Sequence, residues 1–204
     1  MKKILAIVFL LLFTVAVLVP IVLKYSHNPV AELMKFSDSF PSHVFIEKDS
    51  QGEVVEVHLD QTRVTDAGMA HLEGMTNLQT LSVSNTDITD LGLTHIKGLN
   101  NLQSLYVNDT QITDKGLHNL KGLKNLRTLK LGNTRVTDAG MVHLEGMTNL
   151  QTLWLTYTDS TDLGLTHIKG LKNLKTLHLD KWTLFSETSI ADLKKALPNC
   201  KIYH

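Results

Sequence analysis

The chain has 204 residues, 43% of them hydrophobic, which is enough for one domain with a sizeable core and a short accessory segment. Its 20 basic residues balance 20 acidic ones, so no net field attracts DNA, RNA or anionic lipid, and nucleic acid is disfavoured as a partner. The single cysteine, Cys200, excludes an intrachain disulfide and any cysteine-rich metal site.

An uncharged apolar segment lies near the N-terminus. It covers residues 4–23 with the sequence ILAIVFLLLFTVAVLVPIVL, and its 20 residues match the length of a helix that crosses a hydrocarbon core of about 30 Å. Lys2 and Lys3 precede it and favour a cytoplasmic N-terminus. The pattern predicts a single-pass membrane anchor with the remainder periplasmic or at the cell surface. A signal peptide cleaved after residues 14–16, which would leave a secreted protein, stays open as the alternative.

The rest of the chain is dominated by an internal period of 24 residues. A threonine and an aspartate each recur once per period, in five consecutive copies that cover residues 62–181. The threonines are Thr62, Thr86, Thr110, Thr134 and Thr158, and the aspartates are Asp66, Asp90, Asp114, Asp138 and Asp162. A period of 20 to 29 residues containing L-x-x-L-x-L is the signature of leucine-rich repeats.

Each copy predicts a short helix followed by a short strand. In the first copy, Thr65 and Asp66 are residues of the helix-capping type, and Gly74 is placed to end the helix. Leu81 and Val83 then alternate with polar residues, as a strand does. One copy cannot bury its apolar side chains alone, so the copies must stack, with a parallel sheet on the concave side and helices on the convex side. The fold class is therefore α/β, a right-handed solenoid preceded by one transmembrane helix.

The segments around the repeats have other expected roles. Residues 1–24 are the anchor or signal peptide, and residues 25–43 form a juxtamembrane linker. Residues 44–61 contain two apolar stretches separated by a turn and predict a hairpin that caps the N-terminal end. Residues 182–204 predict a C-terminal cap made of a helix and a last short strand. Both caps are needed because an open solenoid exposes its core.

The repeat pattern T-x-V/I-T-D-x-G-L/M-x-H-L/I-x-G-L/M-x-N-L-x-x-L resembles the leucine-rich-repeat family. It is most similar to the subclass with I-T-D-x-G-L after the strand, known from F-box-associated repeats and bacterial envelope proteins. The chain departs from the F-box-associated type, because threonine stands where that type usually has cysteine and no F-box pattern precedes the repeats. The resemblance therefore implies protein-protein binding on the concave face and no ubiquitin-ligase role.

A longer duplication inside the chain indicates where binding occurs. Residues 62–109 match residues 134–181 at 35 of 48 positions, and nine of the 13 differences fall in the strands or just after them. Exposed helix positions such as Glu73 and Glu145 stayed identical, so neutral drift of the surface explains the pattern less well than diversification of the sheet face.

The outward strand positions form columns of polar and aromatic residues. The central column is His58, Ser82, Tyr106, Lys130, Trp154 and His178, flanked on one side by threonines and serine and on the other by a column ending in Asp180. Aromatic and charged residues surrounded by hydroxyl groups are typical of a recognition surface. The predicted partner-binding residues are Tyr106, Lys130, Trp154, Tyr157, His178, His58, Thr152 and Asp180. Gly132 is expected to leave space beside Trp154 for a ligand group.

The sequence offers no enzymatic chemistry. It lacks G-x-S-x-G, G-x-x-x-x-G-K-S/T, H-E-x-x-H and G-x-G-x-x-G. His58 and His178 are predicted to lie five strands apart, about 24 Å, so they cannot share a ligand or a proton. We therefore expect neither cofactor, metal nor catalytic residue, and a protein or peptide as the partner. A passive spacer and a carbohydrate-binding envelope protein remain the alternatives.

Overall fold

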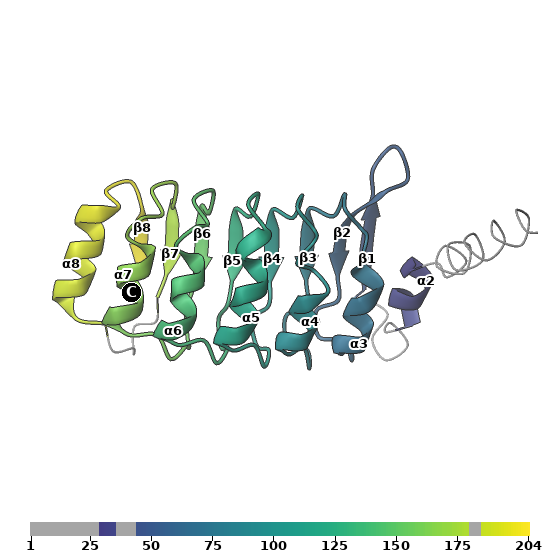
Figure 1. Cartoon of the computed structure of the whole chain (residues 1–204), viewed down its shortest axis with the longest axis horizontal. Coiled ribbons are helices and arrows are strands. Elements are labelled where there is room, and N and C mark those ends of the chain that lie inside the picture. The colour runs from purple at the N-terminus through teal and green to yellow at the C-terminus, as the bar shows by residue number, and fades with distance from the viewer. Residues whose placement is uncertain (1–28, 36–43, 180–184) are drawn as a thin grey trace, which may run out of the picture.

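The computed structural model describes residues 29–35, 44–179 and 185–204. Within them, stacked repeats form one eight-stranded sheet, with the helices in a row against one of its faces (Figure 1). The predicted α/β solenoid with a parallel sheet is confirmed. The predicted anchor, residues 4–23, lies outside these ranges. Among the residues that are described, no helix combines the length and the apolar character needed to cross a membrane.

The strands follow one another in chain order, from β1 at one end to β8 at the other. β1 pairs antiparallel with β2, and β2 to β8 are parallel. The strands are β1 (Phe45–Lys48), β2 (Val54–His58), β3 (Thr80–Ser82), β4 (Ser104–Tyr106), β5 (Thr128–Lys130), β6 (Thr152–Trp154), β7 (Thr176–His178) and β8 (Lys201–Tyr203).

The helices of the repeats are short, and three of them continue into a turn of 3-10 helix. The helices are α2 (Pro29–Met34), α3 (Asp66–Met69), α4 (Asp90–Thr94), α5 (Asp114–His118), α6 (Asp138–Met141), α7 (Asp162–Ile168) and α8 (Glu187–Ala196). The 3-10 turns are η3 (Ala70–Leu72), η4 (Asn119–Gly122) and η5 (Val142–Leu144). The longest repeat helix, α7, has seven residues. Because helices this short are unstable alone, their stability comes from packing against the sheet and against neighbouring repeats.

The core lies between the sheet and the helices and runs the length of the solenoid. The apolar positions of the repeat are almost all buried: in the middle repeat Ile112, Leu117, Leu120 and Leu129 are 0% exposed. One column contains a departure, because Ser160 stands where the other repeats have valine or isoleucine. Ser160 is 2% exposed, and its hydroxyl lies 2.9 Å from Thr158 Oγ1.

The repeated aspartate joins each repeat to the next. Asp66 Oδ1 accepts hydrogen bonds from the backbone N–H groups of Thr89 and Gly92, at 2.8 and 2.9 Å, and Oδ2 accepts one from Thr89 Oγ1 at 2.6 Å. A Cβ at Gly92 would lie 2.6 Å from Asp66 Oδ1, which explains why glycine recurs there. The helix cap itself is the threonine, since Thr89 Oγ1 accepts from the N–H of Leu91. The aspartate, expected to cap its own helix, instead bridges repeats.

Two further ladders hold the turns on either side of the strands. Asn101, Asn125, Asn149 and Asn173 each donate a side-chain hydrogen bond of 2.8 Å to a backbone carbonyl of the preceding repeat. The buried threonines that recur after the strands donate to the carbonyl three residues earlier, as Thr110 does to Val107 at 2.7 Å. Buried backbone groups that the sheet does not pair are satisfied in this way.

Both ends of the core are covered. At the N-terminal end, residues 29–34 of the stretch predicted as a linker form α2, which packs against η3 and buries Leu33 completely. At the C-terminal end, α8 buries Ile190 and Leu193, and β8 extends the sheet beside β7 (Figure 1). The parallel strands β2 to β8 keep one register, and β1 joins them with a register shift between Glu47 and Lys48.

Candidate functional site

The strand register places one outward residue of each strand in a single row across the sheet. We call this row the central column; in strand order it consists of Phe45, His58, Ser82, Tyr106, Lys130, Trp154, His178 and Tyr203. Four of the predicted site residues, Tyr106, Lys130, Trp154 and His178, are neighbours in it. His58 is in the same row, but Ser82 separates it from the other four.

Direct contacts join the second half of the central column. The Lys130 ammonium lies 5.0 Å from the centre of the Tyr106 ring and 4.0 Å from that of Trp154. The Trp154 and His178 rings have centroids 4.2 Å apart, and His178 stacks on Tyr203 at 4.5 Å with 4° between the planes. We call these five residues, from Tyr106 to Tyr203, the aromatic ladder. Cation-π contacts and ring stacking both stabilise it.

The contacts change one expectation about Trp154. Its outward position predicts that serine there leaves the stability nearly unchanged. In the structure Trp154 is half-buried, with Lys130 on one side and His178 on the other. Replacing Trp154 therefore removes packing as well as surface, and a loss of binding in that variant needs a stability control.

The charge of the aromatic ladder depends on His178. Burial, and next the positive charge of Lys130, lower the pKa of His178 below the ordinary histidine value. At neutral pH the imidazole is therefore uncharged, and Lys130 is the cation at this part of the ladder. Lys201, on β8, adds a second ammonium 4.6 Å from the centre of the Tyr203 ring. The outward side chains of β5 to β8 include no acidic residue.

A row of hydroxyl groups runs beside the central column. Thr152 belongs to it, together with Thr80, Ser104, Thr128 and Thr176, and all five residues are half-buried. Thr152 lies on the same strand as Trp154, two residues earlier, so its hydroxyl faces the same side of the sheet. The row supplies polar groups that accept or donate hydrogen bonds next to the aromatic rings.

Tyr157 stands just after β6, in a backbone conformation that tyrosine rarely adopts. Its φ is +57°, in the left-handed region, and its equivalents Gln61, Asn85, Asp109 and Asn133 have φ values of 52 to 57°. Asparagine and aspartate tolerate this region better than other non-glycine residues, and bulky residues there are outliers. Tyr157 is also 65% exposed, so the core gains little from it.

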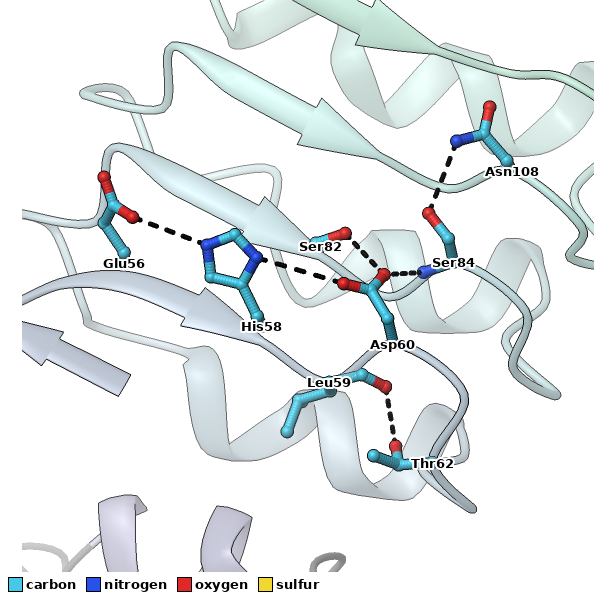
Figure 2. A network of polar contacts seen from close by, with 8 residues as sticks. All are labelled: Glu56, His58, Leu59, Asp60, Thr62, Ser82, Ser84 and Asn108. Atoms are coloured by element: carbon cyan, nitrogen blue, oxygen red, sulfur yellow. Dashed lines mark hydrogen bonds and ion pairs between the residues drawn. The ribbon is translucent and has the colours of Figure 1, made fainter. Parts of the chain in front are cut away.

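At the N-terminal part of the column, polar contacts replace ring contacts (Figure 2). Asp60 Oδ1 accepts hydrogen bonds from Ser82 Oγ at 2.5 Å and from the Ser84 N–H at 2.8 Å. The His58 ring lies between two carboxylates, with Nε2 3.4 Å from Glu56 and Nδ1 3.9 Å from Asp60. Asp180, predicted at the opposite end of the flanking column that contains Asp60, lies outside the described residues.

The expectation for Gly132 is wrong. A Cβ at this position would lie 2.9 Å from Thr156 Oγ1 and 3.1 Å from Asn108 Oδ1. Asn108 Oδ1 also accepts a hydrogen bond of 2.9 Å from the Gly132 N–H. The space beside this glycine is therefore filled by its own neighbours, and no room for a ligand group arises there.

Sequence analysis missed two members of the central column. Tyr203 follows His178 by 25 residues, one more than the repeat period, so counting by 24 does not reach it. Ile202 could have revealed Tyr203, because its apolar side chain aligns with Leu177 and fixes the register of β8. Phe45 belongs to the antiparallel strand β1, and its ring lies 5.6 Å from His58. A repeat period carries no information about an antiparallel neighbour.

Four histidines on the helix side make contacts within the fold. His95 Nδ1 lies 2.6 Å from Glu73, and His167 Nδ1 lies 2.6 Å from Glu145. The His143 ring contacts that of His118, and burial lowers its pKa, with Lys121 and His118 adding to the shift. In the described part of the chain, no group of three or more histidine, cysteine, aspartate or glutamate side chains is placed to hold a metal ion.

The strand register and the recurring ladders define a repeat whose sequence can be compared with known families. The leucine rich repeat family model matches residues 53–112 and 100–159, which together make up more than half of the chain. The chain belongs to the leucine-rich-repeat family. Leucine-rich-repeat proteins typically mediate protein-protein interaction and are in general binding scaffolds without enzymatic activity.

Solved leucine-rich-repeat structures share the fold. Internalin C2 of Listeria monocytogenes has a TM-score of 0.55 and 25% identity, over 84% of this chain and 81% of internalin C2. A leucine-rich-repeat protein of Leptospira interrogans has a TM-score of 0.56 and 25% identity, over 74% of this chain and 37% of that protein. A structure of PEPR1 with AtPEP1 has a TM-score of 0.51 and 18% identity, over 77% and 25%, and its likeness concerns the fold alone. The curated proteins include no match.

Proposed function

We propose that this leucine-rich-repeat protein binds a protein or peptide partner on the outer face of its sheet, through the aromatic ladder, Tyr157 and Thr152. The observation that carries the proposal is Tyr157, which combines 65% exposure with a left-handed backbone conformation. Strained residues cost about 1–3 kcal/mol each and cluster at functional sites. The neighbouring ladder supplies aromatic anchors and the cation Lys130, which is the composition of binding hot spots.

A passive spacer explains these features less well. A spacer needs only a soluble sheet face, and asparagine at position 157 would serve it at lower cost, as it does at positions 85 and 133. The two copies of the duplication also differ most along the strands, where Ser82 corresponds to Trp154 and Asn85 to Tyr157. The changes therefore gather on the face that we assign to the partner.

Carbohydrate binding is less well supported than protein binding. Sugars stack on the free faces of aromatic rings, but from Lys130 to Tyr203 the side chains of the aromatic ladder lie against one another. Trp154 has the Lys130 ammonium 4.0 Å from its centre and the His178 ring at 4.2 Å, on neighbouring strands. The ladder then presents ring edges, N–H groups and hydroxyls outward, which suits the carbonyl groups of a peptide.

Photo-crosslinking tests the binding proposal. A benzophenone amino acid at position 157 resembles the native tyrosine in shape, and the full chain is expressed in its native membranes. We expect a specific crosslinked product from position 157 and none from position 163, a leucine that is 62% exposed on α7. Loss of the product when Trp154 and Tyr106 are both replaced, with the fold retained by circular dichroism, supports the proposal. Identical products from positions 157 and 163, or none from either, would leave the spacer as the better account.

We also propose that residues 4–23 tether the repeats to a membrane, with the repeats outside the cytoplasm. The support is the 20-residue uncharged stretch and the two lysines before it. Alkaline carbonate extraction of membranes, with an intact mass of the extracted chain, tests the tether. We expect the chain in the membrane pellet with residues 4–23 present. A soluble chain that lacks them would show cleavage of a signal peptide instead.

A further inference from the structure

One strand interrupts the central column. At seven of the eight strands the outward residue is a ring or the Lys130 ammonium, and each of these seven contacts a neighbour in the column. The exception is Ser82 on β3, between His58 on β2 and Tyr106 on β4. Because neighbouring strands lie about 4.8 Å apart, His58 and Tyr106 are about 9.6 Å apart along the sheet, and one member of the stack is missing between them.

No ring of the described residues fills the space above Ser82, between His58 and Tyr106. A depression of about 550 Å³ opens over this part of the sheet, lined by His58, Asp60, Ser82, Tyr106, Asp109 and Lys130 among others. Ser82, 4% exposed, forms its floor, and the hydrogen bond to Asp60 holds the hydroxyl down (Figure 2). We call the space above Ser82 the slot.

The walls of the slot favour a flat cation. Lys130 approaches the Tyr106 ring from the β5 side, so the opposite face of that ring is turned toward Ser82. Asp60 and Asp109 line the same hollow, and Glu56 lies next to His58. The negative face of an aromatic ring and nearby carboxylates both attract cations. Lys130 lines the β5 edge of the hollow, with its ammonium over the Tyr106 ring, and the carboxylates of Asp60 and Asp109 outnumber this one cation.

We propose that the slot binds an arginine side chain of the partner, whose guanidinium stacks on Tyr106 and hydrogen-bonds the Asp60 carboxylate. The proposal rests on the proposed function, because it names the partner group that the sheet face takes. Guanidinium is planar, stacks on aromatic faces and matches carboxylate geometry with two N–H groups, whereas a lysine ammonium is a compact and strongly hydrated point charge. Arginine therefore restores the missing member of the stack.

The charges near the slot also indicate in which direction a partner peptide lies across the sheet. The Asp60 carboxylate lies just after β2, and the Lys130 and Lys201 side chains come from β5 and β8. The slot lies over β3, two strand spacings or about 9.6 Å from β5, which an extended peptide covers in about three residues. A partner segment with arginine in the slot places a residue about three positions away beside Lys130, where an acidic side chain fits.

The test uses NMR on the full chain in detergent micelles with isotope-labelled tyrosine and histidine rings. N-acetyl-arginine methylamide is titrated in, and the citrulline analogue, which is flat but uncharged, and the lysine analogue serve as matched probes. We expect saturable shifts of the Tyr106 and His58 ring signals, with arginine binding about tenfold or more tighter than citrulline. Shifts of equal size with citrulline, or no saturable shift at Tyr106 with arginine, would overturn the proposal.

Two variants and one control locate the effect. Ser82→Trp fills the slot with the residue that the equivalent repeat carries at position 154, so the repeat frame accommodates it, and arginine binding is expected to vanish. Asp60→Asn keeps the shape and removes the charge, and about a tenfold loss is expected. Asp192→Asn on α8 removes a charge elsewhere and leaves binding unchanged. Undiminished arginine binding in Ser82→Trp would also overturn the proposal.

The two proposals fail in different ways. If arginine does not bind in the slot while the crosslink at position 157 still captures a partner, the slot is wrong and the proposed function stands. If arginine binds but position 157 captures nothing, the slot stands and the turn at Tyr157 is not part of the partner surface.

Discussion

Replacing Tyr157 by asparagine should raise stability and lower binding at the same time. The left-handed conformation costs an ordinary L-residue about 1–2 kcal/mol, most of which asparagine avoids. Tyr157 is 65% exposed, so only about a third of its side chain is covered. Since full burial of a large apolar side chain contributes about 1.5–3 kcal/mol, that third is worth about 0.5–1 kcal/mol. The difference is a gain of about 0.5–1 kcal/mol for Tyr157→Asn.

Urea unfolding of the full chain in mild detergent, followed by circular dichroism, measures this gain. It corresponds to a rise in Tm of about 1–4 °C for a chain of this size. The reciprocal variant Asn85→Tyr places tyrosine at the equivalent left-handed position, where φ is +55°, and should lose a similar amount. A clear destabilisation by Tyr157→Asn would refute the reasoning, since tyrosine would then be there for the fold. Unchanged partner capture by a stabilised Tyr157→Asn would refute the functional part alone.

Three other changes test the fold and the electrostatics of the site. Leu126→Ala, at a core position 1% exposed, should cost about 2–5 kcal/mol in urea unfolding, and a cost below about 1 kcal/mol would contradict the stacked core. Ser160→Val should stabilise by about 0.5–1.5 kcal/mol, because Thr158 keeps its bond to the Leu155 carbonyl at 2.9 Å, and a net loss would show that the hydroxyl is needed. Lys130→Met should raise the pKa of His178 toward the ordinary value in an NMR titration, and no change would mean that burial alone lowers it.

The lowered pKa of His178 also sets the sign of a pH effect. The unfolded chain takes up the proton first as the pH falls, because its histidine has the ordinary value. Neutral His178 therefore makes its full contribution to stability when the pH is above the ordinary histidine pKa. That contribution is lost as the pH falls from the ordinary pKa through the lowered pKa of the folded state. Asn in place of His178 should remove this part of the pH dependence.

The repeat period predicts most of the fold because stacking copies the same contact five times. Leu81, Leu105, Leu129, Leu153 and Leu177 are all 0% exposed in the observed register, as a single inward column requires. The side-chain bridges could not be predicted in the same way. Asp66 resembles a helix cap in sequence, but its carboxylate accepts hydrogen bonds from Thr89 and Gly92 of the next repeat. The local sequence pattern therefore predicts the type of residue at a position. Its hydrogen-bond partner depends on how closely the next repeat is stacked.

The repeat period predicts which residues share a column on the sheet face. The contacts of those residues depend on distances between side chains, which the period does not give. Tyr106, Lys130, Trp154 and His178 follow from the period, whereas Tyr203 and Phe45 lie on strands outside it. The sequence suggests space beside Gly132. In the structure the two small residues differ, because Gly132 is filled by Thr156 and Asn108, while Ser82 is the floor of a hollow.

Trp154 and Tyr157 differ in what they contribute to the fold. Trp154 is the more conspicuous residue, yet its contacts with Lys130 and His178 give it a role in packing, so its replacement affects both stability and surface. Tyr157 has a strained backbone and is mostly exposed, and Ser160 places a hydroxyl in the core three residues later. The turn that follows β6 thus departs from the most stable sequence twice within four residues. A turn kept for folding alone would carry asparagine and valine there, as the equivalent turn before α6 does with Asn133 and Val136. The binding proposal therefore rests more firmly on the turn than on the aromatic ladder beside it.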